Sequence, residues 1–189
     1  EFHAIVGETK EALAYAKAAA KRAEAIHLVL WDNKCGMWTD CLLSQPYDGT
    51  CTHFSECDFF SVNVLPLWSG AHKGYVDPAI PVATLKAFKV LDYPGGVPVS
   101  LHESGQQWDF PSVWPITHWW IVESLAAAGF TSDATAAAQL WVDSNYKGWT
   151  KYSAMFEKYD CRFPGEPGDG GEYKVVLGFG WTNGVILDL

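Results

Sequence analysis

The stretch that decides the arrangement of this chain is QQWDFPSVWP, residues 106–115. It places two amides, one carboxylate and two indoles within ten residues. A glycine- and proline-rich segment, PGGVP at residues 94–98, precedes it, and an apolar run at residues 116–128 follows it. Amides and carboxylates match sugar hydroxyls, and indole faces match the apolar faces of a pyranose. The stretch is therefore either a carbohydrate site or a structural loop whose tryptophans fill a core.

Helical periodicity dominates the sequence on both sides of this stretch. Residues 9–30 are rich in Ala, Glu and Lys, and their apolar residues recur at steps of three, four and seven, which predicts one long helix. Its expected apolar stripe is Leu13, Ala16, Ala20, Ala23 and Leu30. Further helices are predicted at residues 58–68 (capped by Ser55), 78–91, 116–128, 131 to about 145, 150–159 and 182–189.

The remaining segments predict long loops. Residues 93–115 and 161–181 are rich in glycine and proline, and long ordered loops are usually functional. Residues 97–101 and 173–177 are the two candidates for short strands. We therefore expect an all-α domain of paired helices, with its polar and aromatic motifs in the loops between them.

Composition bounds the class of protein. The 189 residues are 49% hydrophobic and 19% charged, which is typical of one globular domain with a substantial core. The net charge is −9, and arginine occurs only at Arg22 and Arg162, so binding to nucleic acid is not expected. The sequence contains no run of 18 apolar residues, so no membrane-spanning helix is predicted.

Five cysteines leave three alternatives open. Cys35, Cys41, Cys51 and Cys57 fall close together, and Cys161 lies far from them. Two local disulfides would fit a secreted protein, with Cys161 left over. A metal site of Cys51, His53 and Cys57 is disfavoured, because that spacing fits none of the common zinc patterns. Reduced core cysteines are the third alternative, and the spacing does not determine the pairing.

Three blocks of sequence resemble the trehalases, in the order that this family has them. QWDFP at residues 107–111 is similar to the second trehalase signature, and FEKYD at 156–160 is similar to a later family segment. GGEY at 170–173, followed by GFGWTNGV at 178–185, resembles the glycine-rich block near the trehalase C-terminus. The likeness reaches back to LWD at 30–32 and GMW at 36–38. It implies a partial (α/α)6 toroid with its site at one mouth.

The resemblance also implies an activity and a set of site residues. Trehalases hydrolyse the α,α-1,1 bond of trehalose with inversion, which needs a proton donor and a second carboxylate that activates water, and no cofactor or metal. Glu157, between aromatic residues and before a glycine-rich loop, corresponds to the family's base. The expected substrate-binding residues are Gln107, Trp108, Asp109, Glu172, Phe179 and Trp181.

Other family features are missing from residues 1–189. The segment that holds the general acid in trehalases has no match, although ESG at 103–105 is similar to its start, and the first signature and the substrate-binding arginines are also absent. Val113, Ile116 and Val176 depart from the family pattern inside the matched blocks. We therefore expect the C-terminal portion of a catalytic domain, which needs a missing N-terminal portion as its partner. A sugar-binding fragment or pseudoenzyme without the acid is the alternative. The cysteines favour secretion, with a membrane-anchored or vacuolar protein also open.

Overall fold

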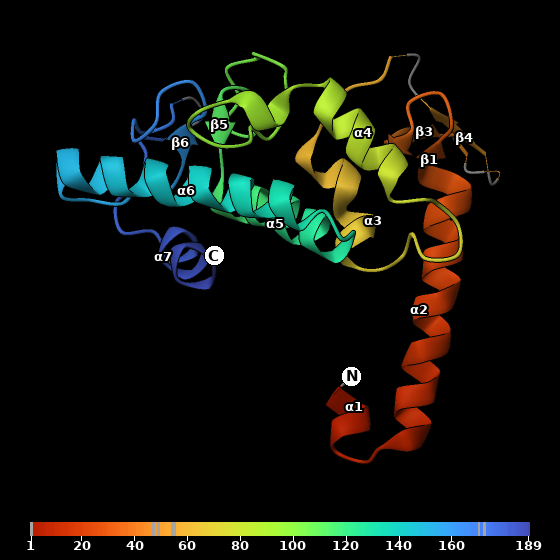
Figure 1. Cartoon of the computed structure of the whole chain (residues 1–189). Coiled ribbons are helices and arrows are strands. Elements are labelled where there is room, and N and C mark those ends of the chain that lie inside the picture. Colours follow the sequence, from red (N-terminus) through yellow and green to blue (C-terminus); the bar gives the residue numbers. More distant parts are fainter. Residues whose placement is uncertain (1, 47, 49, 54–55, 170, 172) are drawn as a thin grey trace.

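The computed structural model describes residues 2–46, 48, 50–53, 56–169, 171 and 173–189 (Figure 1). This part of the chain is mostly helical, as the sequence predicts. The helices are α1 (Phe2–Ile5), α2 (Thr9–Leu30), α3 (Leu65–Trp68), α4 (Ala79–Ala87), α5 (Pro115–Ala127), α6 (Thr131–Tyr152) and α7 (Gly180–Asp188), with 3-10 turns η1 (Ser61–Val64) and η2 (Val90–Asp92).

Three small antiparallel pairs of strands join the loops. They are β1 (Trp31–Asp32) with β2 (Met37–Trp38), β3 (Cys41–Leu43) with β4 (Cys51–His53), and β5 (Ser112–Val113) with β6 (Tyr159–Asp160). The two strands considered for residues 97–101 and 173–177 do not form. Each segment contributes a single isolated bridge, Phe60 to Ser100 and Phe156 to Leu177.

The core lies around α5. This helix is apolar nearly all round, and α3, α6, α7 and η1 pack against it. Figure 1 shows α5 and α6 side by side across the body, with α7 beneath them. One buried cluster joins α5 to α3, α4 and the loop at Val97, and includes Leu67, Leu85, Val97, Ile121, Val122 and Leu125. A second cluster lies next to β5 and β6 and includes Val113, Trp141, Phe156, Tyr159, Cys161 and Val185.

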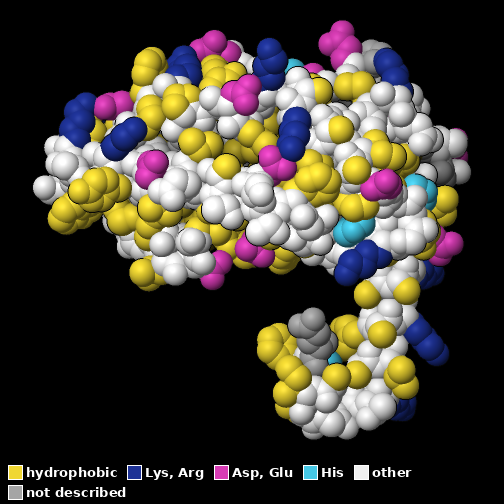
Figure 2. Space-filling model, viewed as in Figure 1, with side chains coloured by type: hydrophobic (Ala, Val, Ile, Leu, Met, Phe, Trp, Pro, Cys, Tyr) yellow, Lys and Arg dark blue, Asp and Glu magenta, His cyan; other side chains and the backbone are white. Residues whose placement is uncertain are grey.

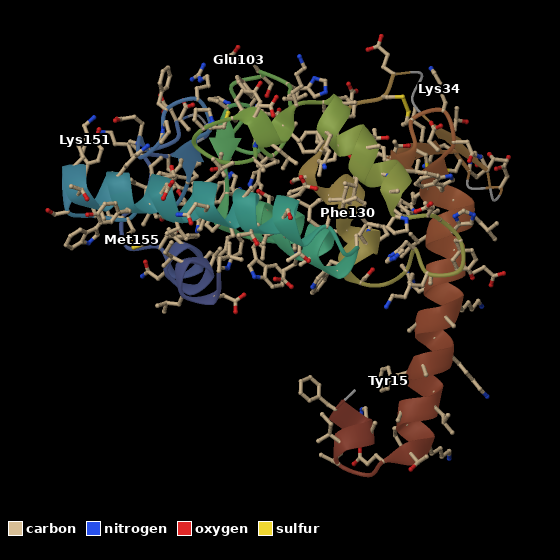
Figure 3. The ribbon with its side chains drawn as sticks, viewed as in Figure 1. Tyr15, Lys34, Glu103, Phe130, Lys151 and Met155 are labelled. Atoms are coloured by element: carbon tan, nitrogen blue, oxygen red, sulfur yellow. A yellow bond between two sulfur atoms is a disulfide. The ribbon has the colours of Figure 1, made fainter. Side chains whose placement is uncertain are left out.

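Helix α2 has the predicted bounds but not the predicted packing. It projects away from the body, none of its residues is buried, and Leu13 is 58% exposed (Figure 1). Tyr15 lies on this projecting part (Figure 3), and hydrophobic side chains are scattered along it in solvent (Figure 2). Only the end of α2, at Ile26 and Leu30, packs against the core. The apolar residues do recur along a helix, but they have little in this chain to pack against.

The helix predicted at 131–145 continues to Tyr152 as α6, and the separate helix predicted at 150–159 is wrong. Gly148 lies inside this helix, where the absence of a side chain allows Tyr159 and Gly165 to pack closely against the backbone. A Cβ there would lie 3.0 Å from Cε1 of Tyr159 and 3.1 Å from the carbonyl oxygen of Gly165. The helix ends at Ser153, whose φ of 54° is left-handed. Residues 154–158 then run irregularly into β6.

The predicted helices at 58–68 and 78–91 are each divided in two. Residues 61–68 form η1 followed by α3, with Pro66 in the first turn of α3, and the cap proposed at Ser55 lies outside the described residues. Asp77 Oδ1 accepts a hydrogen bond from the Ala79 amide (2.9 Å) at the start of α4. Lys89, at a left-handed φ of 56°, separates α4 from η2.

Of the three alternatives for the cysteines, two local disulfides is the one that forms, with Cys35 paired to Cys57 and Cys41 to Cys51, while Cys161 is buried and free. Cys51 and Cys57 belong to different disulfides, so the metal site considered for them with His53 is wrong. Burial raises the pKa of Cys161 to about 12, which keeps it a protonated, inert thiol. Two disulfides indicate an extracellular or secretory compartment. No helix in the described part of the chain is long and apolar enough to cross a membrane.

One buried histidine ties the central loop to the helices. His118 of α5 accepts a hydrogen bond from the Val97 amide at Nδ1 (3.1 Å), and its Nε2 donates to the carbonyl of Ala137 in α6 (2.9 Å). Its ring stacks on Trp141, with centroids 5.3 Å apart. Burial lowers the pKa of His118 to about 4, so the ring is neutral near pH 7 and serves as both acceptor and donor.

Two helical glycines should respond in opposite ways to alanine. A Cβ at Gly184 of α7 would meet nothing within 4 Å, so Gly184→Ala should stabilise the fold by roughly 1 kcal/mol through helix propensity. Gly148→Ala should destabilise it by about 1–3 kcal/mol, because the methyl overpacks against Tyr159 and Gly165. Urea unfolding of the two variants measures both changes, and stabilisation by Gly148→Ala would contradict the packing role.

Stability should fall as the pH drops from about 6.5 to about 4, the window between the unfolded and folded pKa of His118. Between these two pH values His118 is protonated in the unfolded state and neutral in the folded state. The free energy of unfolding therefore decreases by up to about 3 kcal/mol across the window. The measurement is urea unfolding at pH 7.0, 5.5 and 4.5. His118→Gln, which keeps a donor and an acceptor, should be less stable at pH 7 and depend less on pH. Equal pH dependence in both proteins would show that His118 does not contribute.

Candidate active site

Two loops that are distant in sequence meet at one side of the helices. β5 pairs with β6, with Ser112 opposite Asp160 and Val113 opposite Tyr159. Farther along, the Gly171 amide donates to the carbonyl of Gly105 (3.3 Å). A Cβ on Gly171 would lie 2.6 Å from Cβ of Gln107, so this approach requires glycine. The loops at 93–115 and 161–181 thus converge on one side of the helices.

Four aromatic side chains gather where the loops meet. Trp108 stacks on Trp114, with centroids 4.2 Å apart and planes at 3°. Phe179 and Trp181, at the start of α7, approach the Trp114 ring edge-on at 6.4 Å. Trp114 is buried, while Trp108 and Trp181 are 41% and 48% exposed. This aromatic cluster has a fixed interior ring and two accessible ones.

The polar residues of the central stretch hold the loop in shape. Asp109 Oδ1 accepts from Ser100 (2.7 Å), and its Oδ2 accepts from Ser104. Indole Nε1 of Trp114 donates to the carbonyl of Gln107 (2.7 Å). Oε1 of Gln107 is buried and has no hydrogen-bond partner among the described residues. Both carboxylate oxygens of Asp109 already have hydroxyl donors, whereas Gln107 retains an acceptor for a further group.

Glu157 lies in the irregular segment between α6 and β6, not within a helix as the sequence suggested. Its amide donates to the carbonyl of Val176 (2.9 Å). The side chain is only 1% exposed. Oε1 accepts a hydrogen bond from the Tyr173 hydroxyl (2.7 Å), and Oε2 has no hydrogen-bond partner in the described part of the chain. A buried carboxylate with one unengaged oxygen is suited to take a proton.

Lys158 brings a buried positive charge beside this carboxylate. Its side chain is 1% exposed, and Nζ lies 5.5 Å from the centroid of Trp114. Burial lowers the pKa of Lys158, while the charges of Glu157 and Asp169 act in the opposite direction. Sequence reasoning missed Lys158 and Tyr173 as site residues. The sequence did contain a signal for them, because Lys158 lies in the matched block FEKYD and Tyr173 in the matched block GGEY.

Asp160, the other carboxylate of that block, is committed to an ion pair. Arg162 Nη2 lies 2.7 Å from Asp160 Oδ2, and Nε lies 3.0 Å from Oδ1. The Arg162 guanidinium also lies over the rings of Phe110 and Phe163, each at 5.5 Å, and contacts Glu103 at 3.6 Å. Figure 3 shows Glu103 on the loop above β5. Through Phe110 and Glu103 the Arg162 guanidinium joins the two loops, and among the described carboxylates of this block only Glu157 keeps an oxygen without a hydrogen-bond partner.

The structure thus brings most of the predicted site residues into one region. Trp108, Phe179 and Trp181 share the aromatic cluster, Gln107 contacts Trp114, and Glu157 lies one residue from Lys158, which reaches that ring. Asp109 lies beside them but points to Ser100 and Ser104. Glu172 lies outside the described residues.

The model of the trehalase family matches residues 1–189, the whole chain. The chain belongs to the trehalase family. It is 37% identical to the trehalase of Homo sapiens over 194 residues, covering all of this chain and 32% of that protein. It is 36% identical to the trehalase of Apis mellifera over 200 residues, covering all of this chain and 30% of that one.

A solved structure supports the fold. The neutral trehalase of Saccharomyces cerevisiae superposes with a TM-score of 0.65 at 19% identity, covering 93% of this chain and 30% of that one. The expected helical fold therefore corresponds to part of a larger trehalase fold. This trehalase-family chain spans about a third of the length of the curated relatives it matches.

Proposed function

We propose that this chain supplies the general base and part of the sugar pocket of an inverting hydrolase that cleaves α,α-trehalose into two glucose molecules. The observation that supports it is Glu157, which is buried beside the aromatic cluster with Oε1 held by Tyr173 and Oε2 without a partner among the described residues. In this role Glu157 takes a proton from water as the water attacks the anomeric carbon.

The aromatic cluster suits the sugar. Trp108 and Trp181 present partly exposed indoles, and an indole face packs against the C–H face of a pyranose. By family resemblance, Gln107 binds one sugar hydroxyl. By family resemblance, Glu172 binds a second hydroxyl. These contacts hold the ring while Glu157 acts on the water.

The general acid comes from elsewhere in the proposal. An inverting pair of carboxyl groups lies about 6.5–9.5 Å apart, with the water on one side of the sugar and the acid on the other. Among the described carboxylates of the site, Asp109 accepts from two serines and Asp160 pairs with Arg162. We assign the acid and the substrate-binding arginines to a portion of the protein beyond this chain, as the resemblance implies.

The exposed apolar faces support such a portion. The α2 stripe lies in solvent, and a groove of about 360 Å³ between α2 and α3 is lined mainly by apolar side chains, among them Ile26, Leu30, Trp38, Leu65 and Trp68. Large exposed apolar faces are unusual on a free domain. We propose that this chain is part of an (α/α)6 toroid whose remaining helices cover these faces, in a secreted enzyme.

A second function, sugar binding without catalysis, follows from the missing acid segment. In that case the aromatic cluster holds a sugar and the bond is never protonated. Turnover by the complete protein distinguishes the two functions.

In the complete enzyme, Glu157→Gln should lower kcat by about 10²–10⁴-fold with KM nearly unchanged, because the amide keeps the shape and loses the base. Glu24→Gln, at an exposed position on α2, is the matched control and should behave as wild type. Azide should restore turnover to Glu157→Ala and give β-glucosyl azide. Near-normal activity of Glu157→Gln would place the base elsewhere.

The 189-residue chain by itself should hydrolyse trehalose very slowly or not at all. A positioned acid contributes about 10²–10⁴-fold, and this chain lacks the matched acid segment. Glucose release by the purified chain measures it, with the complete protein as the positive control. A turnover number typical of glycosidases from this chain would mean that it already contains the acid.

A further inference from the structure

On the basis of the proposed function, we infer that Tyr173 is a positioning residue. Its hydroxyl holds Oε1 of Glu157 and thereby leaves Oε2 as the oxygen that takes the proton from the attacking water. Tyr173 touches neither sugar nor water in this role, since it acts through Glu157. The two carboxylate oxygens of Glu157 are chemically equivalent, and the contact with Tyr173 makes Oε2 the one that accepts the proton.

Backbone contacts keep the two residues in register. The segment before Glu157 lies antiparallel to the segment after Tyr173, with a bridge between Phe156 and Leu177. The Glu157 amide donates to the carbonyl of Val176 (2.9 Å), and the Gly178 amide donates to that of Met155 (2.9 Å). Tyr173 therefore reaches Glu157 from a segment that is fixed to the same backbone.

The start of α7 secures the same segment from the other side. Thr182 is buried, and its hydroxyl donates to the carbonyl of Phe156 (2.7 Å). This contact links Glu157 to the helix that presents Phe179 and Trp181. The carboxylate and the aromatic cluster are consequently held by one continuous set of contacts.

The hydroxyl of Tyr173 is the hydrogen-bond donor to Oε1 of Glu157, at a depth where solvent water does not reach that oxygen. Glu157 is 1% exposed, so solvent does not satisfy Oε1 in place of the tyrosine. A hydrogen bond to a charged group in such a place is stronger than one in water. Without it the carboxyl group could rotate, and either oxygen could turn away from the substrate.

The charges around the pair are consistent with a fixed donor. The hydrogen bond to Glu157 raises the pKa of Tyr173, so the hydroxyl stays protonated through the neutral range. Lys158, the residue next to Glu157, is the positive charge beside the pair: burial lowers its pKa, while the charges of Glu157 and of Asp169 raise it. Tyr173 is therefore a donor to Glu157 and not a proton source for the sugar.

The test is Tyr173→Phe in the complete enzyme, which removes one hydroxyl and keeps the ring. We expect kcat to fall about 10- to 100-fold, the value of one hydrogen bond to a charged group, with KM within about threefold of wild type. The acidic limb of the kcat/KM profile should move to higher pH, because the carboxylate loses a donor that favours its charged form. Tyr146→Phe, at an exposed position on α6, is the matched control and should change neither quantity.

A second measurement checks the contact without turnover. In the protein labelled with ¹³C at tyrosine Cζ, the resonance that disappears in Tyr173→Phe should titrate above the ordinary tyrosine pKa. It should titrate lower in Glu157→Gln, because the negative charge is gone. An unchanged titration in Glu157→Gln would show that the two side chains do not interact, and would overturn the inference.

The outcomes separate this inference from the proposed function. If Glu157→Gln is fully active, the assignment of the base fails. If Glu157→Gln is inactive while Tyr173→Phe matches wild type in kcat and pH profile, the positioning role alone fails. A raised KM and a lowered Tm in Tyr173→Phe, with an unmoved pH profile, would mean a structural role and would also overturn the inference.

Discussion

The pairing of β5 with β6 is the contact on which the rest of the site depends. It is only two residues long on each side, yet Val113 and Tyr159 within it are fully buried. Neighbouring backbone bonds extend it, since the Cys161 amide donates to Pro111 (2.9 Å) and the Gly95 amide donates to Cys161 (2.7 Å). A Cβ on Gly95 would lie 2.3 Å from the carbonyl oxygen of Asp160, so the two segments can meet only at glycine.

Once the loops are joined, their buried charges compensate one another. Glu157 and Lys158 are both 1% exposed, and isolated charges at such depth would be costly. The Tyr173 hydroxyl stabilises the carboxylate, and the Trp114 ring lies near the ammonium group. Asp160 and Arg162 pair at the rim, where the guanidinium also covers Phe110. The site therefore combines a buried acidic group with an aromatic surface.

The helices around this site are unevenly covered. Helices α3, α6 and α7 pack around α5. Only the C-terminal end of α2, at Ile26 and Leu30, packs against the core. This chain corresponds to about a third of the length of the trehalases it matches, and under the proposed function the remaining helices of the larger fold supply the missing partners. In that proposal the apolar faces now on the surface are interior faces of the complete protein.

The sequence by itself determined the mostly helical class and the family, and it offered two local disulfides as one of three alternatives for the cysteines. Local signals were sufficient for α2, whose bounds agree with its propensity and its terminal turn, and for the motif blocks that identify the trehalases. It did not determine that Gly148 lies inside one long helix, because the reason is the close approach of Tyr159 and Gly165. Nor could it show that Tyr173 holds Glu157 or that Asp109 is engaged by serines. These facts depend on contacts between segments distant along the chain, and only the tertiary structure brings those segments together.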